Sequence, residues 1–189
     1  MPNPDAISAI ALGAWLLTAA ISDIGSRRIP NWVVAGGMLC GFALQALAPA
    51  GTGLFSFWWG GLGSALLGLL TGLALFLPLH LLRILGAGDV KLLAMVGVWL
   101  GPQPLLGATL LTLLAGGAMA IVMMLASGSA RSVLNNVRLL LTTLIVGAHA
   151  GKLAAMDATV TSGVRLPYAL AIAAGTLAQL VWMLAHAGP

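Results

Sequence analysis

Charged residues are scarce in this sequence. Only 6% of its 189 residues are charged, and all four acidic residues are Asp, because the chain contains no Glu. A soluble globular domain carries about 25% charged residues, so an ordinary soluble fold is excluded. Hydrophobic residues make up 60% of the chain and the mean hydropathy is +1.07. The composition predicts a polytopic membrane protein, with the lipid bilayer as its first partner.

Residues that bind metals or nucleic acids are also few. A single cysteine, Cys40, excludes an intrachain disulfide and a zinc site built on Cys ligands. The three histidines, His80, His149 and His186, are dispersed, which does not favour a shared metal site. The eight cationic residues are spread along the chain, unlike the clustered basic face of a nucleic-acid-binding protein. We therefore expect no cofactor, no metal and no nucleic-acid partner.

Apolar runs of membrane length predict the fold. A bilayer core about 30 Å thick needs about 20 helical residues. The runs that reach or approach this length are residues 6–22, 32–47, 57–82, 90–100, 105–126 and 166–186. The fourth run is short unless residues 84–89 are counted with it, which would bring Asp89 to the membrane edge or inside it. We expect an all-α helix bundle with about six transmembrane helices, forming one integral membrane domain over residues 1–189.

The positions of the cations predict the orientation. No Lys or Arg precedes the first run, so the basic region of a cleavable signal peptide is missing and the run should remain as a span. With the N-terminus outside, every Lys and Arg lies in or beside the inward loops 23–31, 83–89 and 127–165. The run at 139–146 is too short to span, and we interpret residues 137–150 as a cytoplasmic-side interfacial helix before the last span.

Two of the four acids fall at matching depths in this topology. Asp23 ends the first span at its cytoplasmic end, and Asp89 precedes the fourth span at the same end. Acids at membrane spans usually have a function. Two carboxyl groups brought together can share a proton and activate water. The alternative is that each simply faces interfacial water, which is how we interpret Asp5 and Asp157.

The neighbours of Asp89 favour a functional role. Gly86 and Gly88 precede the acid, and glycine allows backbone geometries and close approaches that other residues do not. Such a loop can hold a carboxyl group in a tight position and admit an extended substrate. Lys91 could bias the protonation of an acid pair, or it could simply be an orientation signal.

Three segments of the chain carry a family resemblance. Residues 22–31, Ser-Asp-Ile-Gly-Ser-Arg-Arg-Ile-Pro-Asn, resemble the first aspartate motif of type IV prepilin peptidases. Residues 86–92, Gly-Ala-Gly-Asp-Val-Lys-Leu, resemble their Gly-x-Gly-Asp signature, and Leu166-Pro167-Tyr168 is similar to the start of their final span. The compact size is most similar to the short enzymes of tight-adherence (Flp-type) pilus systems.

The resemblance implies a membrane aspartic endopeptidase of the bacterial inner membrane. Similar enzymes remove a short basic leader from prepilins, cutting after a glycine at the cytoplasmic face. It implies that Asp23 and Asp89 are the catalytic pair, without saying which is acid and which is base. Prepilin leaders and a pilus assembly or secretion machinery are the implied partners. Longer members carry paired Cys-x-x-Cys motifs and N-methylate the pilin; these motifs are missing here, and methyltransferase activity is not predicted.

Two other classes of function remain open from the residues alone. A small transporter or proton-relay subunit could use the two acids as relay sites. Transporters are often built from internal repeats, and the sequence shows none. A non-catalytic assembly or scaffold protein of the secretion system is the other alternative, and it would tolerate loss of either acid.

Overall fold

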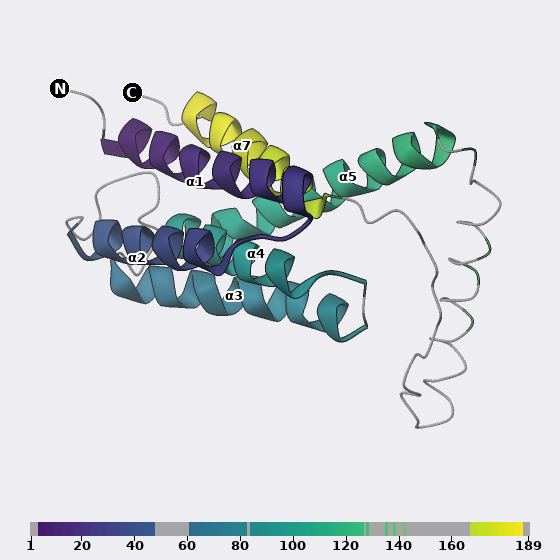
Figure 1. The fold of residues 1–189 in the computed structure, drawn as a ribbon. Coiled ribbons are helices and arrows are strands. Elements are labelled where there is room, and N and C mark those ends of the chain that lie inside the picture. Colours follow the sequence, from purple (N-terminus) through teal and green to yellow (C-terminus); the bar gives the residue numbers. More distant parts are fainter. Residues whose placement is uncertain are drawn as a thin grey trace. The chain divides into compact units, whose positions relative to one another are not determined.

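Every regular element that the structure describes is a helix. The computed structural model describes residues 4–47, 61–82, 84–126, 128, 135, 138, 142 and 167–186. The helices are α1 (Pro4–Ser26), α2 (Asn31–Leu47), α3 (Leu62–Leu81), α4 (Ala87–Leu100), α5 (Pro102–Ala126) and α7 (Tyr168–His186), drawn in Figure 1. The expected all-α fold is confirmed.

Four of these helices are long and apolar enough to cross a membrane. They are α1, α3, α5 and α7, and α2 is a shorter apolar helix. Their outer faces carry exposed Leu and Ile side chains, as a lipid-facing surface requires. The helices agree with the predicted runs to within a few residues. The helix expected at 137–150 lies outside the described residues, apart from residues 138 and 142, and the orientation of the N-terminus stays a prediction.

The chain separates into two compact units. The first comprises residues 1–116 and 167–189, and the second comprises residues 117–166. The first unit contains α1 to α4, α7 and the beginning of α5, together with both acids of interest. The expectation of a single membrane domain over residues 1–189 remains a prediction.

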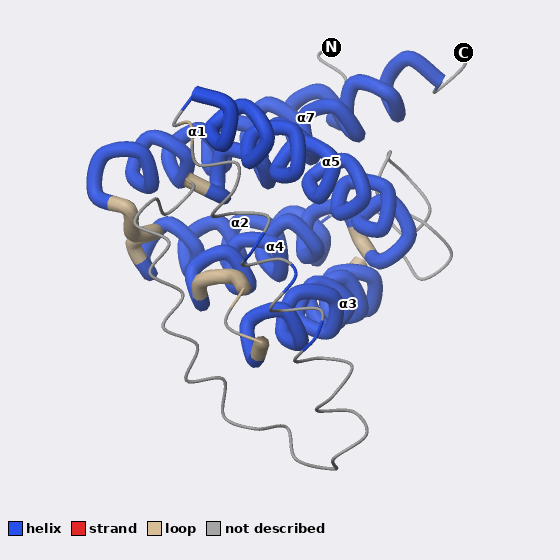
Figure 2. The backbone as a smooth tube through the Cα atoms, turned by 90° about the vertical axis from the view of Figure 1, so that its right-hand side faces the viewer, coloured by secondary structure: helices blue, strands red, loops and turns tan. Residues whose placement is uncertain are grey.

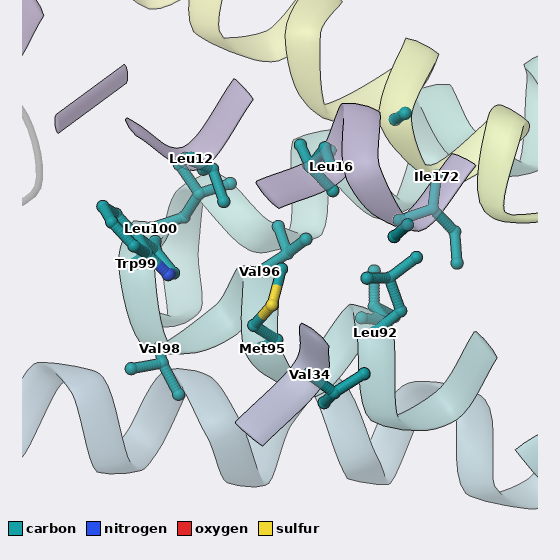
Figure 3. Close-up of a cluster of buried hydrophobic side chains, with 14 of the residues drawn as sticks. Leu12, Leu16, Val34, Leu92, Met95, Val96, Val98, Trp99, Leu100 and Ile172 are labelled. Carbon is teal, nitrogen blue, oxygen red and sulfur yellow. The ribbon is translucent and has the colours of Figure 1, made fainter. Parts of the chain in front are cut away.

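Helix α4 lies at the centre of the first unit. It contacts α1, α2, α3 and α7, and all its residues from 92 to 100 are buried. Figure 3 shows its side chains Leu92, Val96 and Leu100 in one cluster with Leu16 of α1 and Ile172 of α7. A helix that is apolar on every side belongs in the interior of a bundle. From residue 92 to residue 100, α4 is therefore held by protein contacts on every side.

Glycines bring α3 and α4 into backbone contact. Gly68 of α3 lies against the backbone of Gly97 on α4, and Gly72 lies against Ala94. Small residues at this spacing allow two helices to approach closely in lipid. This contact fixes the depth of α4, and with it the position of Asp89 in the first turn of α4.

Polar contacts fix α2 against the other end of α4. The indole Nε1 of Trp99 donates a hydrogen bond to the carbonyl oxygen of Gly37 at 2.9 Å. The Gln45 side chain donates through Nε2 to the carbonyl oxygen of Trp99 at 3.2 Å. Buried polar groups need such partners, so the two bonds set the register of α2 on α4.

Helix α7 runs antiparallel to the first part of α5. Tyr168 lies against Gly116, Gly175 lies against Thr112, and Gln179 lies against Gly107. On its other side α7 packs along α1, and Figures 1 and 2 both show these two helices side by side. The two contacts place the first turn of α7 beside the last turn of α1.

Candidate active site

Asp23 is buried where α1 meets α7. It lies in the last turn of α1, and only 8% of its surface is exposed. Its Oδ2 accepts a hydrogen bond of 3.2 Å from the backbone N–H of Ala169, the second residue of α7. The first N–H groups of a helix have no partner within the helix, and they form its positive end. The buried carboxyl group therefore has a partner from a helix far away in the sequence.

Asp89 lies in the first turn of α4 and is half-buried. Its Oδ2 accepts a hydrogen bond of 3.1 Å from the backbone N–H of Gly86, which immediately precedes α4. A carboxylate that bonds the N–H just before its own helix is one half of a capping box. Asp89 also interacts electrostatically with Asp23. The two acids that the sequence singled out thus lie at the same end of the bundle, near each other.

The two acid-bearing segments also touch through their neighbours. Ile29 packs over Gly88, where an added Cβ would lie 3.4 Å from the Ile29 Cδ1. Lys91 donates a hydrogen bond from Nζ to the side-chain oxygen of Asn31 at 3.3 Å, and both side chains are exposed. The end of α1 with the loop after it, and the start of α4, therefore form one contact region.

The glycines act through the space that they leave. Gly86 has an ordinary extended backbone, with φ −72° and ψ 151°, and Gly88 lies within helix α4. An added Cβ at Gly86 would lie 3.2 Å from Oδ2 of Asp89, which is tighter than an ordinary contact. Close approach of the Asp89 carboxyl group explains Gly86 better than an unusual backbone geometry does.

Tyr168 was not among the expected site residues, although its Pro-Tyr segment was noted. It is the first residue of α7, and its ring lies over Gly116 and pairs with Phe76 at a centroid distance of 6.1 Å. It interacts electrostatically with Asp89. A signal for it was present, because its apolar run starts directly after the last predicted inward loop and therefore at the depth of Asp23.

The other candidates lie apart from this group or outside the description. His80 makes a hydrogen bond of 3.0 Å through Nδ1 to the carbonyl oxygen of Leu85. His186 stacks on Trp182 near the end of α7. Within the described part of the chain, no three His, Cys, Asp or Glu side chains are grouped so that they could hold a metal ion. The side chain of Asp5 and the whole of Asp157 lie outside the described residues.

The fold and this geometry define a multi-pass helical membrane protein with two interacting carboxyl groups at one end of its bundle. The sequence matches the model of the type IV leader peptidase family over residues 10–121, more than half of the chain. The chain belongs to this family, and its general activity is that of a membrane protease acting on leader peptides of the prepilin type. The searches of curated proteins and of solved structures gave no match.

Proposed function

We propose that this protein is an aspartic endopeptidase that removes the short basic leader from Flp-type prepilins, cutting after a glycine. Asp23 and Asp89 are its catalytic pair. The observation that carries the proposal is that the two acid-bearing segments, distant in the sequence, meet at one end of the bundle through Ile29 on Gly88 and the Lys91–Asn31 hydrogen bond. Each acid is also held by a backbone N–H that engages one of its two oxygens.

The chemistry needs the two carboxyl groups in different protonation states. The ionised one takes a proton from a water molecule, and the resulting hydroxide attacks the scissile carbonyl carbon. The protonated one donates its proton to the carbonyl oxygen as the tetrahedral intermediate forms. When the C–N bond breaks, the new amine takes up the proton that came from the water. Two acids close together suit this division, because both cannot easily be ionised at once.

We place the reaction at the cytoplasmic face of a bacterial inner membrane. The support is the charge distribution, since all eight Lys and Arg residues fall in or beside the loops that share the side of Asp23 and Asp89. A prepilin leader is basic and stays on that side, while the apolar pilin helix enters the bilayer. Pilus assembly or secretion components are the proposed partners after cleavage.

Co-expression with a candidate prepilin tests the activity. The candidate has a basic leader, a glycine and an apolar helix. The protein should convert it to a shorter form, and mass spectrometry of the new N-terminus should place the cut directly after the glycine. Flux of an ion or solute into liposomes that hold the purified protein, without any cleavage, would favour the transporter alternative and refute the proposal.

A further inference from the structure

The family match stops before the last helix. It ends at residue 121, whereas α7 begins at Tyr168. In the structure the first turn of α7 nevertheless reaches the site, because the backbone N–H of Ala169 donates a hydrogen bond to Oδ2 of Asp23. The family match therefore does not cover the last helix, whereas the structure places the first turn of this helix at the site.

We propose that the first turn of α7 completes the active site, with the Ala169 N–H positioning Asp23. It is a positioning group rather than a reacting one. The inference rests on the proposed function, because it assigns a role relative to the two catalytic acids.

The hydrogen bond between Asp23 and α7 gives a partner both to the carboxyl group and to the first turn of the helix. The residues before α7 are Leu166 and Pro167, and neither has the side-chain oxygen that usually caps a helix N-terminus. Asp23 lies in the last turn of α1, where the negative end of the helix dipole disfavours a carboxylate. The Ala169 N–H, at the positive end of α7, offsets this effect and holds Oδ2 of Asp23. Because this hydrogen bond holds Oδ2, it also fixes the direction in which the other oxygen of the Asp23 carboxyl group points.

Tyr168 is held in place independently of Asp23. Gly116 leaves the space for its ring, since an added Cβ there would lie 2.7 Å from Cε2 of the ring. Phe76 of α3 packs on the ring at an interplanar angle of 57°. Tyr168 is therefore anchored on α3 and α5, and it holds the first turn of α7 in place beside Asp23.

The titratable groups on the helices that pack on α1 are few. Helix α4 has Asp89 and Lys91, α7 has Tyr168 in its first turn and His186 in its last, and Arg27 and Arg28 follow α1 itself. Helix α2, which also packs on α1, has no acidic or basic residue. A change in the pH dependence that follows removal of the Ala169 N–H can therefore be compared with this short set.

The test removes one N–H group at a time from the first turn of α7. Ala169→Pro removes the donor to Asp23, and proline is tolerated in the first turn of a helix. Leu170→Pro is the matched control, because it places proline in the same turn but leaves the Ala169 N–H intact. The Leu170 N–H is bonded within its own turn to the carbonyl oxygen of Pro167. Prepilin cleavage by the purified full-length protein is measured as kcat and KM across pH.

Ala169→Pro should lower kcat about tenfold or more, as expected for loss of a hydrogen bond to a charged group, with KM within about twofold. The pH dependence of kcat should also change in Ala169→Pro, because this variant loses a bond to one of the two acids. Leu170→Pro should keep the wild-type pH dependence.

Gly116→Ala is the second arm, and it decides alone if Ala169→Pro does not accumulate in the membrane. Its added Cβ would lie 2.7 Å from Cε2 of Tyr168 and displace the first turn of α7, so kcat should fall at least about threefold, whereas Gly117→Ala, with nothing within 4 Å, should keep the wild-type kcat. Wild-type kcat in whichever of Ala169→Pro and Gly116→Ala accumulates would overturn the inference. Asp23→Asn and Asp89→Asn are assayed in parallel: if they cleave normally, the proposed function fails instead.

Discussion

Substitution of Gly68 by Ala should destabilise the protein and reduce its activity, although the residue is far from the acids in the sequence. The new Cβ would meet the backbone carbonyl of Gly97 well inside contact distance, and backbone cannot rotate away as a side chain can. Overpacking of this kind costs about 1–3 kcal/mol, and a backbone clash belongs at the upper end. Replacing a mid-helix Gly by Ala returns about 1 kcal/mol of helix propensity. The net loss is therefore about 2 kcal/mol.

Thermal unfolding of the purified protein in detergent measures this loss. A change of 1 kcal/mol shifts the melting temperature by about 2–4 °C for a chain of this size, so Gly68→Ala should melt about 4–8 °C lower. Gly13→Ala is the matched control, since its added Cβ would meet only Leu177 at an ordinary 3.8 Å. The control should melt at or slightly above the wild-type temperature.

Activity provides the second readout of the same variant. Displacement of α4 from α3 moves the helix that carries Asp89, so leader cleavage should fall at a temperature where the variant is still folded. If Gly68→Ala melts with Gly13→Ala and cleaves normally, the close α3–α4 contact and its role in placing Asp89 are both refuted.

Three further substitutions test the loops around the acids. Gly86→Ala should lower kcat several-fold because the new methyl group crowds Oδ2 of Asp89, whereas Gly25→Ala, with nothing within 4 Å, should not; equal rates in both would contradict this. Arg27 directly follows α1 and has φ 52°, a backbone conformation that glycine adopts more easily. Arg27→Gly should therefore stabilise the protein by about 1 kcal/mol in a melting experiment, and a lower melting temperature would argue against that geometry. Lys91→Met loses one exposed hydrogen bond to Asn31 and should destabilise by no more than about 1 kcal/mol with less than a tenfold change in kcat; a larger fall in kcat would give Lys91 a catalytic role.

The helices could be predicted because membrane spans are long and apolar, and length alone identifies them. The limits of α1, α2, α5 and α7 follow from this signal. The place of α4 could not be predicted, since residues 92–100 are apolar on every side and suit a short span and a buried helix equally well. Its central position depends on the glycines of α3, whose partners are not visible in a local pattern.

The matching depth of Asp23 and Asp89 followed from the distribution of cations, without any structure. Their surroundings did not follow, because the Ala169 N–H is a backbone group with no sequence signature, and it meets Asp23 only through the packing of α1 on α7. Gly86 was expected to allow an unusual backbone geometry and a close approach to the chain. Its backbone is ordinary in the structure, and the group that approaches it closely is the Asp89 carboxyl group. Local motifs identified the two acids, and packing between distant helices supplied the partner of Asp23.

The rate of leader cleavage by Asp23→Asn and Asp89→Asn tests the central claim most directly. A general acid or base contributes about 10²- to 10⁴-fold, so each variant should lose at least about 10²-fold in kcat while it still accumulates in the membrane with a wild-type melting temperature. Asp5→Asn, the same change at an acid outside the site, should cleave at the wild-type rate. Cleavage at the wild-type rate by either Asp23→Asn or Asp89→Asn would contradict the account.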